Sequence, residues 1–430
     1  MSNIMLESLY IDNFKSFKDS KFEFGKLNCL IAPNNTGKSN LVEALEFLDS
    51  LIYQDVSRAI AKVGLQNIQN IHYVDNKKIV INAKFKIQNM VLLTNELIDY
   101  KLELAFLFSM DLKAKKHTID ILATGNKIKS VTIDKSDLKL GFIPRLFDDF
   151  NEEVNHYKTY LEVLKKKNYR SFDFEYNHST LRYKINTQYK STEKLIESLF
   201  ELNIDKKNET LFKQLDFRLL FNKSSLFTSH YFHPNMIKEI QNSGYTYFLK
   251  NGTNLSEYLS ILDKDVFEDI STSLIGEVEL INSLELRDNF ITELVFNEEV
   301  NNKAYPIKLQ KISDGTVHFV AVMTALIGNK HSIGMMIEEP ERHLHMKVLS
   351  YILKTMRDDD KQIFFTTHST ELLSQLELDE IIFMFRDYNG DTKGIRAKDI
   401  ENIKKIMKIY KDDLIEMIKI GILDNLEDEL

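Results

Sequence analysis

The sequence has 430 residues, a hydrophobic fraction of 43% and a formal net charge of −8. The length allows two or three domains with sizeable cores, and the acidic balance excludes a surface that attracts nucleic acid everywhere. A single cysteine, Cys29, excludes an internal disulfide. Since the N-terminus also lacks a signal-peptide pattern, we expect a cytoplasmic protein. Charged residues interrupt the most apolar long stretch, residues 90–110, so we expect no membrane span.

A phosphate-binding loop is predicted early in the chain. The apolar run 27–31 predicts a buried strand, and residues 41–52 show apolar positions at helical spacing. Between them lies a loop that contains Gly-Lys-Ser, in the order strand, loop, helix that a phosphate-binding loop requires. Backbone N–H groups of such a loop and of the helix N-terminus point at phosphates. The predicted nucleotide-binding residues here are Asn34, Asn35, Thr36, Gly37, Lys38, Ser39 and Asn40.

Two side chains of this loop have predicted roles. Lys38 would contact the β- and γ-phosphates of ATP, and the Ser39 hydroxyl would ligate Mg²⁺. One position departs from the G-x-x-x-x-G-K-[ST] pattern, because Ala32 stands where the first glycine is expected. Glycine is favoured where the backbone is strained or approaches a ligand closely, so Ala32 leaves the loop geometry open. The alternative is a chance Gly-Lys-Ser at a helix start.

Taken in order, the chain predicts an α/β protein with an interrupted nucleotide-binding fold. Strands are expected between residues 6 and 24 and at 78–87, helices at 150–167 and 192–202, helices again from 254 to 281, and strands at 291–296 and 304–309. The predicted divisions are an N-terminal ATPase half at 1–90, a helical or mixed insertion at 91–245, a C-terminal ATPase half at 246–396, and an amphipathic helix with an acidic tail at 397–430.

A polar turn precedes a predicted helix at 317–326. Ser313, Asp314, Gly315 and Thr316 form this turn. Ser313 could simply cap the helix, with Gly315 as a turn residue. A serine and a backbone-rich turn at a helix N-terminus can also bind a phosphate.

Two adjacent acids end a second apolar strand, at residues 333–337. Carboxylates at the end of a buried strand are costly unless a positive group lies there, and a nucleotide-bound Mg²⁺ would be that group. Glu338 would hold the metal, mostly through water, and Glu339 would be the general base that activates the attacking water. The alternative is a strand that ends in solvent-exposed acids.

A third buried strand, within residues 362–369, is followed by His368. Polar residues at the carboxyl edge of strands lie where α/β sheets place ligands. His368 could therefore contact the γ-phosphate. The alternative is a histidine that caps or packs at a strand end.

Together these motifs resemble the ABC-type ATPase heads of the SMC/RecF-like superfamily. The resemblance is closest to the stand-alone, OLD-related AAA-type ATPases of bacterial anti-phage systems such as Septu and PARIS. It rests on residues 13–17, the Gly-Lys-Ser loop, residues 313–316, 337–345 and 366–369. It implies an ABC-type ATPase head, a mixed sheet flanked by helices, with a largely helical insertion between the two halves.

The resemblance also implies residue roles. Ser313, Asp314 and Gly315 look like the signature motif, which contacts ATP held by another subunit, and this implies a homodimer or higher homo-oligomer. Residues 343–345 look like a dimer-contact loop, and His368 looks like the switch histidine. Lys15 matches a basic residue near the nucleotide. Gln66 or Gln69 would be the Q-loop glutamine, with Gln66 as a metal ligand beside Ser39 and Glu338. Glu338 stands where an aspartate is usual.

The motifs are compatible with three functions. The first is an ATP-hydrolysing switch that controls a separate effector, an HNH- or Toprim-like nuclease, in anti-phage defence, with DNA or a phage component as a further partner. The second is a RecF-type repair or chromosome-maintenance ATPase, which the lack of sustained heptads disfavours. The third is a transporter subunit, which the long separation of Ser39 from Ser313 disfavours. The short stretch after His368 is too small for a nuclease domain. The helix expected near 400–423 would pack on its own sheet or dock a partner protein.

Overall fold

The structure is a computed structural model of the chain. It describes residues 3–33, 35–53, 56–73, 78–88, 101–113, 116–125, 128–134, 174–177, 182–185, 225–239, 244–278, 281–288, 292–329 and 332–400. The chain divides into two compact units. Unit 1 consists of Met1–Glu23, Ser39–Ser224 and Gly390–Lys393, and unit 2 of Phe24–Lys38, Ser225–Asn389 and Gly394–Leu430.

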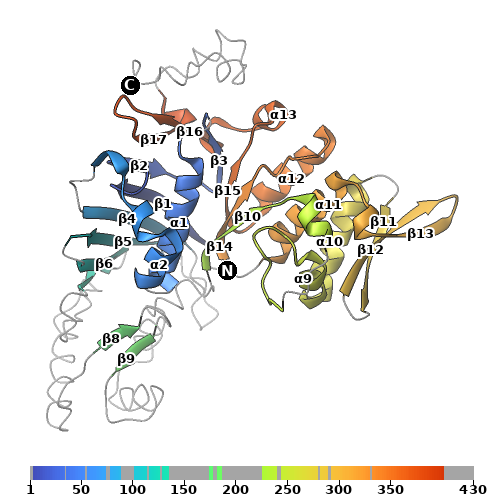
Figure 1. Cartoon of the computed structure of the whole chain (residues 1–430), viewed down its shortest axis with the longest axis horizontal. Helices are drawn as coiled ribbons and strands as arrows, with labels where there is room; N and C mark the ends of the chain where they lie inside the picture. Colours follow the sequence, from blue (N-terminus) through green and yellow to red (C-terminus); the bar gives the residue numbers. More distant parts are fainter. Residues whose placement is uncertain are drawn as a thin grey trace. The chain divides into compact units, whose positions relative to one another are not determined.

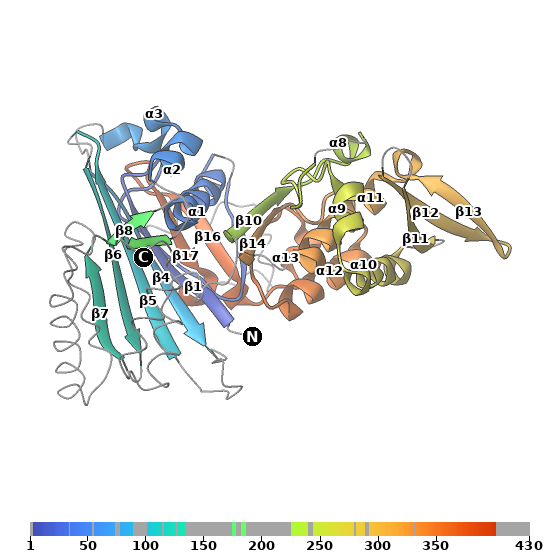
Figure 2. The same ribbon diagram turned by 90° about the horizontal axis from the view of Figure 1, so that it is seen from below.

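Unit 1 contains an antiparallel sheet with the strand order β2-β1-β4-β5-β6-β7 (Figure 2). Its strands are β1 (Asn3–Asp12), β2 (Ser20–Glu23), β4 (Lys78–Gln88), β5 (Lys101–Asp111), β6 (Lys116–Gly125) and β7 (Ile128–Asp134). In β1 the buried side chains are Ile4 and Leu6, then Leu9 and Ile11. A bulge between Leu6 and Ser8 keeps both pairs on the same face despite the odd spacing. The predicted strands near residues 6–24 and at 78–87 are thus confirmed in part.

The stretch 13–19 is a turn and not the strand that its sequence suggested. Asn13, Lys15 and Asp19 all have positive φ angles, which extended strands do not adopt. The turn is closed by hydrogen bonds between the backbones of Phe14 and Phe17.

Helix α1 (Lys38–Tyr53) packs on the sheet of unit 1 through aromatic side chains. The ring of Phe47 lies 5.4 Å from that of Phe14 and 5.8 Å from that of Phe108. Three short elements follow it: α2 (Val56–Val63), α3 (Leu65–Ile68) and η1 (Ile71–Tyr73).

The described part of the insertion between residues 101 and 185 contains strands. It forms β5, β6 and β7 together with a two-stranded sheet of β8 (Phe174–Asn177) and β9 (Arg182–Ile185). The expectation of a largely helical insertion stays a prediction, because most of 91–245 lies outside the described residues. Along β5, buried Phe106, Phe108 and Met110 alternate with less buried neighbours, a period of two that fits a strand with one covered face. The helices expected at 150–167 and 192–202 lie outside the described residues.

Unit 2 is built on a second sheet, with the order β10-β14-β15-β3-β16-β17 (Figure 1). Its strands are β10 (Ser225–Tyr231), β14 (Ser332–Glu338), β15 (Gln362–Thr366), β3 (Leu27–Ile31), β16 (Ile381–Arg386) and β17 (Thr392–Arg396). The pairings of β10 with β14, β14 with β15, and β3 with both β15 and β16 are parallel. The carboxyl ends of these strands therefore meet at one edge. The α/β class is confirmed.

Helices and a small sheet complete unit 2. The helices are α8 (Pro234–Lys238), α9 (Leu255–Ile261), α10 (Lys264–Glu277), α11 (Asp314–Met323), α12 (Met346–Asp358) and α13 (Thr370–Leu373), with π turns at η3 (Thr324–Gly328) and 3-10 turns at η2 (Leu309–Lys311), η4 (Leu378–Glu380) and η5 (Ala397–Asp399). Strands β11 (Ile281–Asp288), β12 (Thr292–Val300) and β13 (Lys303–Lys308) form an antiparallel sheet. The helices and strands predicted between 254 and 309 are present with shifted ends.

The central strand β3 is fixed by one buried asparagine. Asn28 Nδ2 donates to the carbonyl oxygens of Gly25 (2.9 Å) and Ile363 (3.2 Å). Its Oδ1 accepts from Gly25 N (2.8 Å) and from the guanidinium of Arg396 (2.6 Å). Because the buried amide is satisfied on both sides, it sets the register of β3 against β15 and so the position where the next loop begins.

No helix among the described residues is long and apolar enough to cross a membrane. The amphipathic helix and acidic tail predicted at the C-terminus lie almost entirely in 401–430, outside the described residues, and stay a prediction. The predicted division at residues 90, 245 and 396 likewise stays a prediction.

Two buried histidines make the stability of unit 2 sensitive to acid. His230 stacks against Phe232, its ring 5.5 Å away, and burial lowers the pKa of His230 to about 3. Burial also lowers the pKa of His318 to about 4. Since the unfolded chain binds these protons at a higher pH than the folded chain, the stability that the neutral rings contribute is full above about pH 6.5 and is lost as the pH falls.

We therefore expect His230→Phe to flatten the pH dependence of unfolding between pH 6.5 and pH 4. The replacement keeps the aromatic contact and removes one titrating group, so the slope should decrease by up to about 1.4 kcal/mol per pH unit. This slope is measured by urea unfolding, with hydrogen exchange of the β10 and β14 amides as the probe. His117→Phe, at an exposed position, is the matched control. An unchanged slope in His230→Phe would contradict the assignment.

Candidate functional site

The loop between β3 and α1 has the backbone of a phosphate-binding loop. Asn35 and Gly37 have φ angles of 64° and 111°, so the chain turns sharply before the helix. The Thr36 hydroxyl donates to Pro33 O at 2.8 Å. Lys38 Nζ donates to Ala32 O at 2.6 Å and approaches Pro33 O at 3.4 Å. The lysine ammonium thus lies over the loop itself, where a phosphate would meet it.

The backbone conformation of Ala32 explains why an alanine can stand where the pattern has glycine. It is not among the described non-glycine residues with positive φ, so its backbone conformation is open to any L-amino acid. The left-handed positions of the loop are Asn35, of a residue type that tolerates them, and Gly37. The question that the sequence left open is answered for the backbone at this position.

The electrostatics of the loop favour an anion. Burial lowers the pKa of Lys38, and the nearby charge of Glu339 opposes that effect by raising it. The first turn of α1 holds no acidic residue, so the positive end of the helix dipole is not neutralised there. The guanidinium of Arg386, at the end of β16, donates to Asn35 O at 2.9 Å and supports the loop from the neighbouring strand.

Glu338 and Glu339 lie at the carboxyl end of β14, as predicted. Glu338 is the last residue of the strand and is exposed. Glu339 has a φ of 45°, and its backbone N–H donates to Thr366 O at 3.1 Å and to Thr366 Oγ1 at 3.3 Å. Its carboxylate pairs with the guanidinium of Arg342 at 3.0 Å. The loop after β14 is therefore tied to the end of β15.

The same loop packs against the turn before α11. The His318 ring donates to Pro340 O at 3.2 Å. A Cβ placed on Gly315 would meet His343 O at 2.5 Å, so only glycine fits there without a shift of the loop. His343 itself has a φ of 65°. The two segments that sequence reasoning placed in separate motifs are in direct contact.

Ser313 and Asp314 have local partners. Ser313 caps α11, its hydroxyl oxygen accepting from Thr316 N at 3.2 Å, which matches the capping alternative. Asp314 forms an ion pair with Lys238 at 2.6 Å, and that hydrogen bond lowers the pKa of Asp314. Capping leaves further lone pairs on the serine oxygen, so a phosphate-contacting role stays a prediction.

His368 is exposed at the carboxyl end of β15, beside the Glu339 loop. Its backbone N–H donates to Glu341 Oε1 at 3.0 Å, and the Thr367 hydroxyl donates to the same oxygen at 2.7 Å. Lys38, Glu339 and His368 thus come from three loops at the same edge of the parallel sheet.

The other predicted residues lie in unit 1 or outside the described residues. Ser39 is the exposed second residue of α1. Asn40 Nδ2 donates to Ser16 Oγ at 2.7 Å, and Lys15 forms an ion pair with Glu43. Gln69 Nε2 donates to Tyr73 O at 3.1 Å. Gln66 lies in α3, but its side chain, like the whole of Asn34, is outside what the structure describes.

Within the described residues, no group of three or more His, Cys, Asp or Glu side chains could hold a metal ion by itself. The donors predicted for Mg²⁺ are oxygens, the type that this ion prefers, and it commonly binds through one or two carboxylates together with phosphates. Glu338 places one such oxygen donor at the end of β14.

Sequence reasoning gave no role to several residues that shape this site. Glu341 and Arg342 stand inside the recognised motif, but their contacts depend on the fold of the loop. Arg386 follows a strand that neighbours β3, and Lys238 precedes the signature by a long stretch of chain. The one available signal was the parallel sheet, which predicts that residues after adjacent strands meet.

Substitution of Gly315 tests the contact between the two loops. Gly315→Ala should force residues 339–344 to shift, because the new Cβ meets a backbone oxygen and not a side chain that can turn away. We expect faster hydrogen exchange at these amides and a cost of about 1–3 kcal/mol in unfolding free energy. Gly276→Ala is the control, since no atom lies within 4 Å of its added Cβ. It should stabilise α10 by up to about 1 kcal/mol. Equal protection of the loop in both variants would contradict the contact.

Comparisons with known proteins agree with an ATPase assignment. The chain is 24% identical to a Helicobacter pylori protein named ATP/GTP phosphatase, across 98% of this chain and 97% of that protein. It is 35% identical to human structural maintenance of chromosomes protein 1B over 68 residues, 15% of this chain and 5% of that protein.

Two solved structures of SMC heads are similar to it. One is the Smc head domain with an extended coiled coil, bound to the C-terminal domain of ScpA, from Pyrococcus furiosus: 16% identity, 96% and 99% of the two chains, TM-score 0.42. The other is the SMC head domain from Thermotoga maritima: 12% identity, 91% and 98%, TM-score 0.42.

A family model described as "AAA domain, putative AbiEii toxin, Type IV TA system" matches residues 131–374. The match begins after the phosphate-binding loop and contains the segments around Gly315, Glu339 and His368. Since it spans more than half of the chain, this protein belongs to that family of AAA domains.

Proposed function

We propose that the protein binds ATP and hydrolyses it, with Glu339 as the general base. The observation that carries the proposal is the placement of Lys38, Glu339 and His368 after three strands, β3, β14 and β15, that pair in parallel and end at one edge of the sheet. The charge of Glu339 also acts on Lys38, raising its pKa against the effect of burial. A cation for phosphate and a carboxylate for water at one sheet edge are what nucleotide hydrolysis needs. The family of AAA domains and the name of the Helicobacter pylori relative support this chemistry.

The remaining residues take roles around this pair. The loop backbone and Lys38 would hold the β- and γ-phosphates, while Ser39 and Glu338 would ligate Mg²⁺, with Gln66 as a further ligand. The metal supplies positive charge against the phosphate oxygens. His368, fixed through its backbone to Glu341, would donate a hydrogen bond to the γ-phosphate.

Glu339 must change partners before it can act. Its carboxylate pairs with Arg342, whose guanidinium also lies 3.3 Å from His233 Nδ1. The ion pair engages Glu339 Oε2, one of the two oxygens that could accept a proton from water. The base therefore becomes fully effective when the pair loosens, and nucleotide binding or subunit contact would be the event that loosens it.

The Ser313–Gly315 turn would complete a site on a second copy of the chain. Its contact with His343 joins the trans-acting turn to the loop of the base. In a two-fold dimer each nucleotide would then contact the loop of one copy and the turn of the other.

We further propose that this dimer is a switch for a separate effector protein, a nuclease, in anti-phage defence. The family description, which names a toxin and a type IV TA system, supports a defence role over chromosome maintenance. The effector and the trigger are parts of the proposal that the resemblance to stand-alone defence ATPases motivates.

Turnover should depend on Glu339 and affinity on Lys38. Glu339→Gln should lower ATP turnover on the order of 10²–10⁴-fold while nucleotide still binds, because the amide cannot accept a proton. Lys38→Ala should weaken binding of ATP, measured by calorimetry. Lys361→Ala is a matched control, since that lysine also donates to a backbone carbonyl, Leu326 O at 2.8 Å, away from the site. Wild-type turnover of Glu339→Gln would remove the assignment of the base.

The second expectation concerns assembly. Glu339→Gln with ATP and Mg²⁺ should accumulate as a dimer or larger homo-oligomer, since the nucleotides that join the subunits are not consumed. Light scattering of the protein purified from its native operon measures the mass, and mass spectrometry identifies any effector that it retains. A monomer under these conditions would contradict the trans-acting role of the turn.

A further inference from the structure

Glu341 has well-defined contacts in the site, but none of the roles described above uses them. It follows the base by two positions and lies half-buried between the loops after β14 and β15. Its Oε1 accepts two hydrogen bonds, from the Thr367 hydroxyl at 2.7 Å and from the His368 backbone N–H at 3.0 Å. Bonds to an ionised acceptor are stronger than neutral ones.

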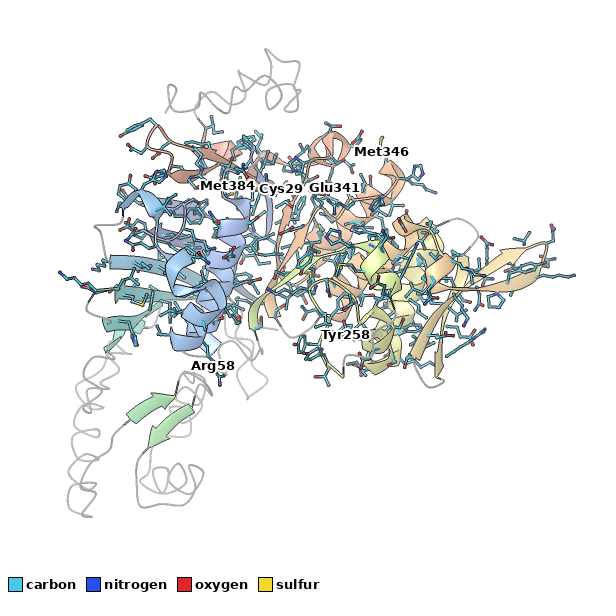
Figure 3. The ribbon with its side chains drawn as sticks, viewed as in Figure 1. Cys29, Arg58, Tyr258, Glu341, Met346 and Met384 are labelled. Atoms are coloured by element: carbon cyan, nitrogen blue, oxygen red, sulfur yellow. The ribbon has the colours of Figure 1, made fainter. Side chains whose placement is uncertain are left out.

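The other carboxylate oxygen of Glu341 is buried, and no donor among the described residues reaches it. The glutamate lies near the strand core, since its charge adds to the effect of burial in raising the pKa of Cys29 (Figure 3). Holding a carboxylate here is costly. An apolar side chain would avoid that cost but would accept neither hydrogen bond, so the oxygen acceptor at this position has a use.

The contacts of Glu341 complete a double tie between the two loops. The Glu339 backbone N–H donates to Thr366. Two residues later, the Glu341 side chain accepts hydrogen bonds from the Thr367 hydroxyl and the His368 backbone N–H. The base and the histidine are thus fixed to each other through consecutive residues on both loops. The Thr367 hydroxyl is itself anchored, accepting from Ser369 N at 3.0 Å.

We infer that Glu341 is a positioning residue for ATP hydrolysis: its Oε1, through the Thr367 hydroxyl and the His368 backbone N–H together, holds the loop after β15 in register with the Glu339 loop. The inference rests on the proposed function. Glu341 touches neither nucleotide nor water in this role. It acts through the geometry of the other two, so its loss changes the catalytic step and not the capture of the nucleotide.

The test compares turnover and KM for ATP in variants of the full chain. Glu341→Ala and Thr367→Val should each lower kcat by up to about 10²-fold, the scale of a misplacement of about 1 Å, with KM unchanged. Glu341→Gln should stay within about threefold of wild type, because its amide oxygen accepts the same two bonds. Thr367→Ser, which keeps the hydroxyl, should also be active. The double variant should be no worse than Glu341→Ala alone, since Thr367→Val removes one of the two hydrogen bonds that Glu341→Ala already removes.

Glu380→Ala is the control for Glu341→Ala. Glu380 is also in unit 2, accepts from Arg357 and likewise raises the pKa of Cys29, but it lies in η4, outside the two loops. Its loss should leave kcat unchanged.

Three results would overturn the inference: Glu341→Gln as slow as Glu341→Ala, which would require the charge itself; a raised KM with unchanged kcat; or a normal kcat in Thr367→Val. Should Glu341→Ala not fold, Thr367→Val decides alone. A Glu339→Gln variant of normal turnover would instead refute the base and leave the Glu341 contacts intact.

Discussion

Parallel pairing of β3, β14 and β15 is the constraint on which the candidate site depends. It brings three carboxyl ends to one edge, so that loops distant in sequence meet. Hydrogen bonds from Glu339 N to Thr366 then convert proximity into a fixed geometry. Were β14 displaced by one residue along β15, Glu338 would no longer lie opposite Thr366 and the hydrogen bonds of Glu339 N to Thr366 would be lost. The apolar strands set the register, and this register brings the polar residues at their ends within hydrogen-bonding distance.

The loop after β14 holds its shape against an unfavourable backbone. Glu339 and His343 are both left-handed, a conformation that costs of order 1 kcal/mol or more for such residues. Local hydrogen bonds of Arg342 N to Glu339 O and of Leu344 N to Glu341 O close the turn, and His318 holds Pro340 from outside. The Glu339 carboxylate and the His343 carbonyl that faces Gly315 both come from this one short segment.

The sequence predicted the parts of this arrangement that are governed by chain order and periodicity. Strand 27–31, the helix after Gly37 and the strands before Glu339 and His368 follow from apolar runs and their ends. The secondary structure of the insertion was harder to predict, because β5 lies in an apolar stretch whose pattern is equally typical of a buried helix. The roles of Glu341 and Arg386 could not be predicted, since each acts on a residue from another strand. The strand predicted at Asn13–Asp19 was wrong because alternating apolar residues do not reveal the left-handed backbone of a turn.

The charge of Glu339 has an electrostatic consequence for the loop before α1. The carboxylate raises the pKa of a lysine whose burial lowers it, so it stabilises the ammonium form of Lys38. An amide in its place would remove this stabilisation and leave the effect of burial unopposed by that charge. A substitution at position 339 therefore changes two things at once: the group at the end of β14 and the electrostatic environment of the loop lysine.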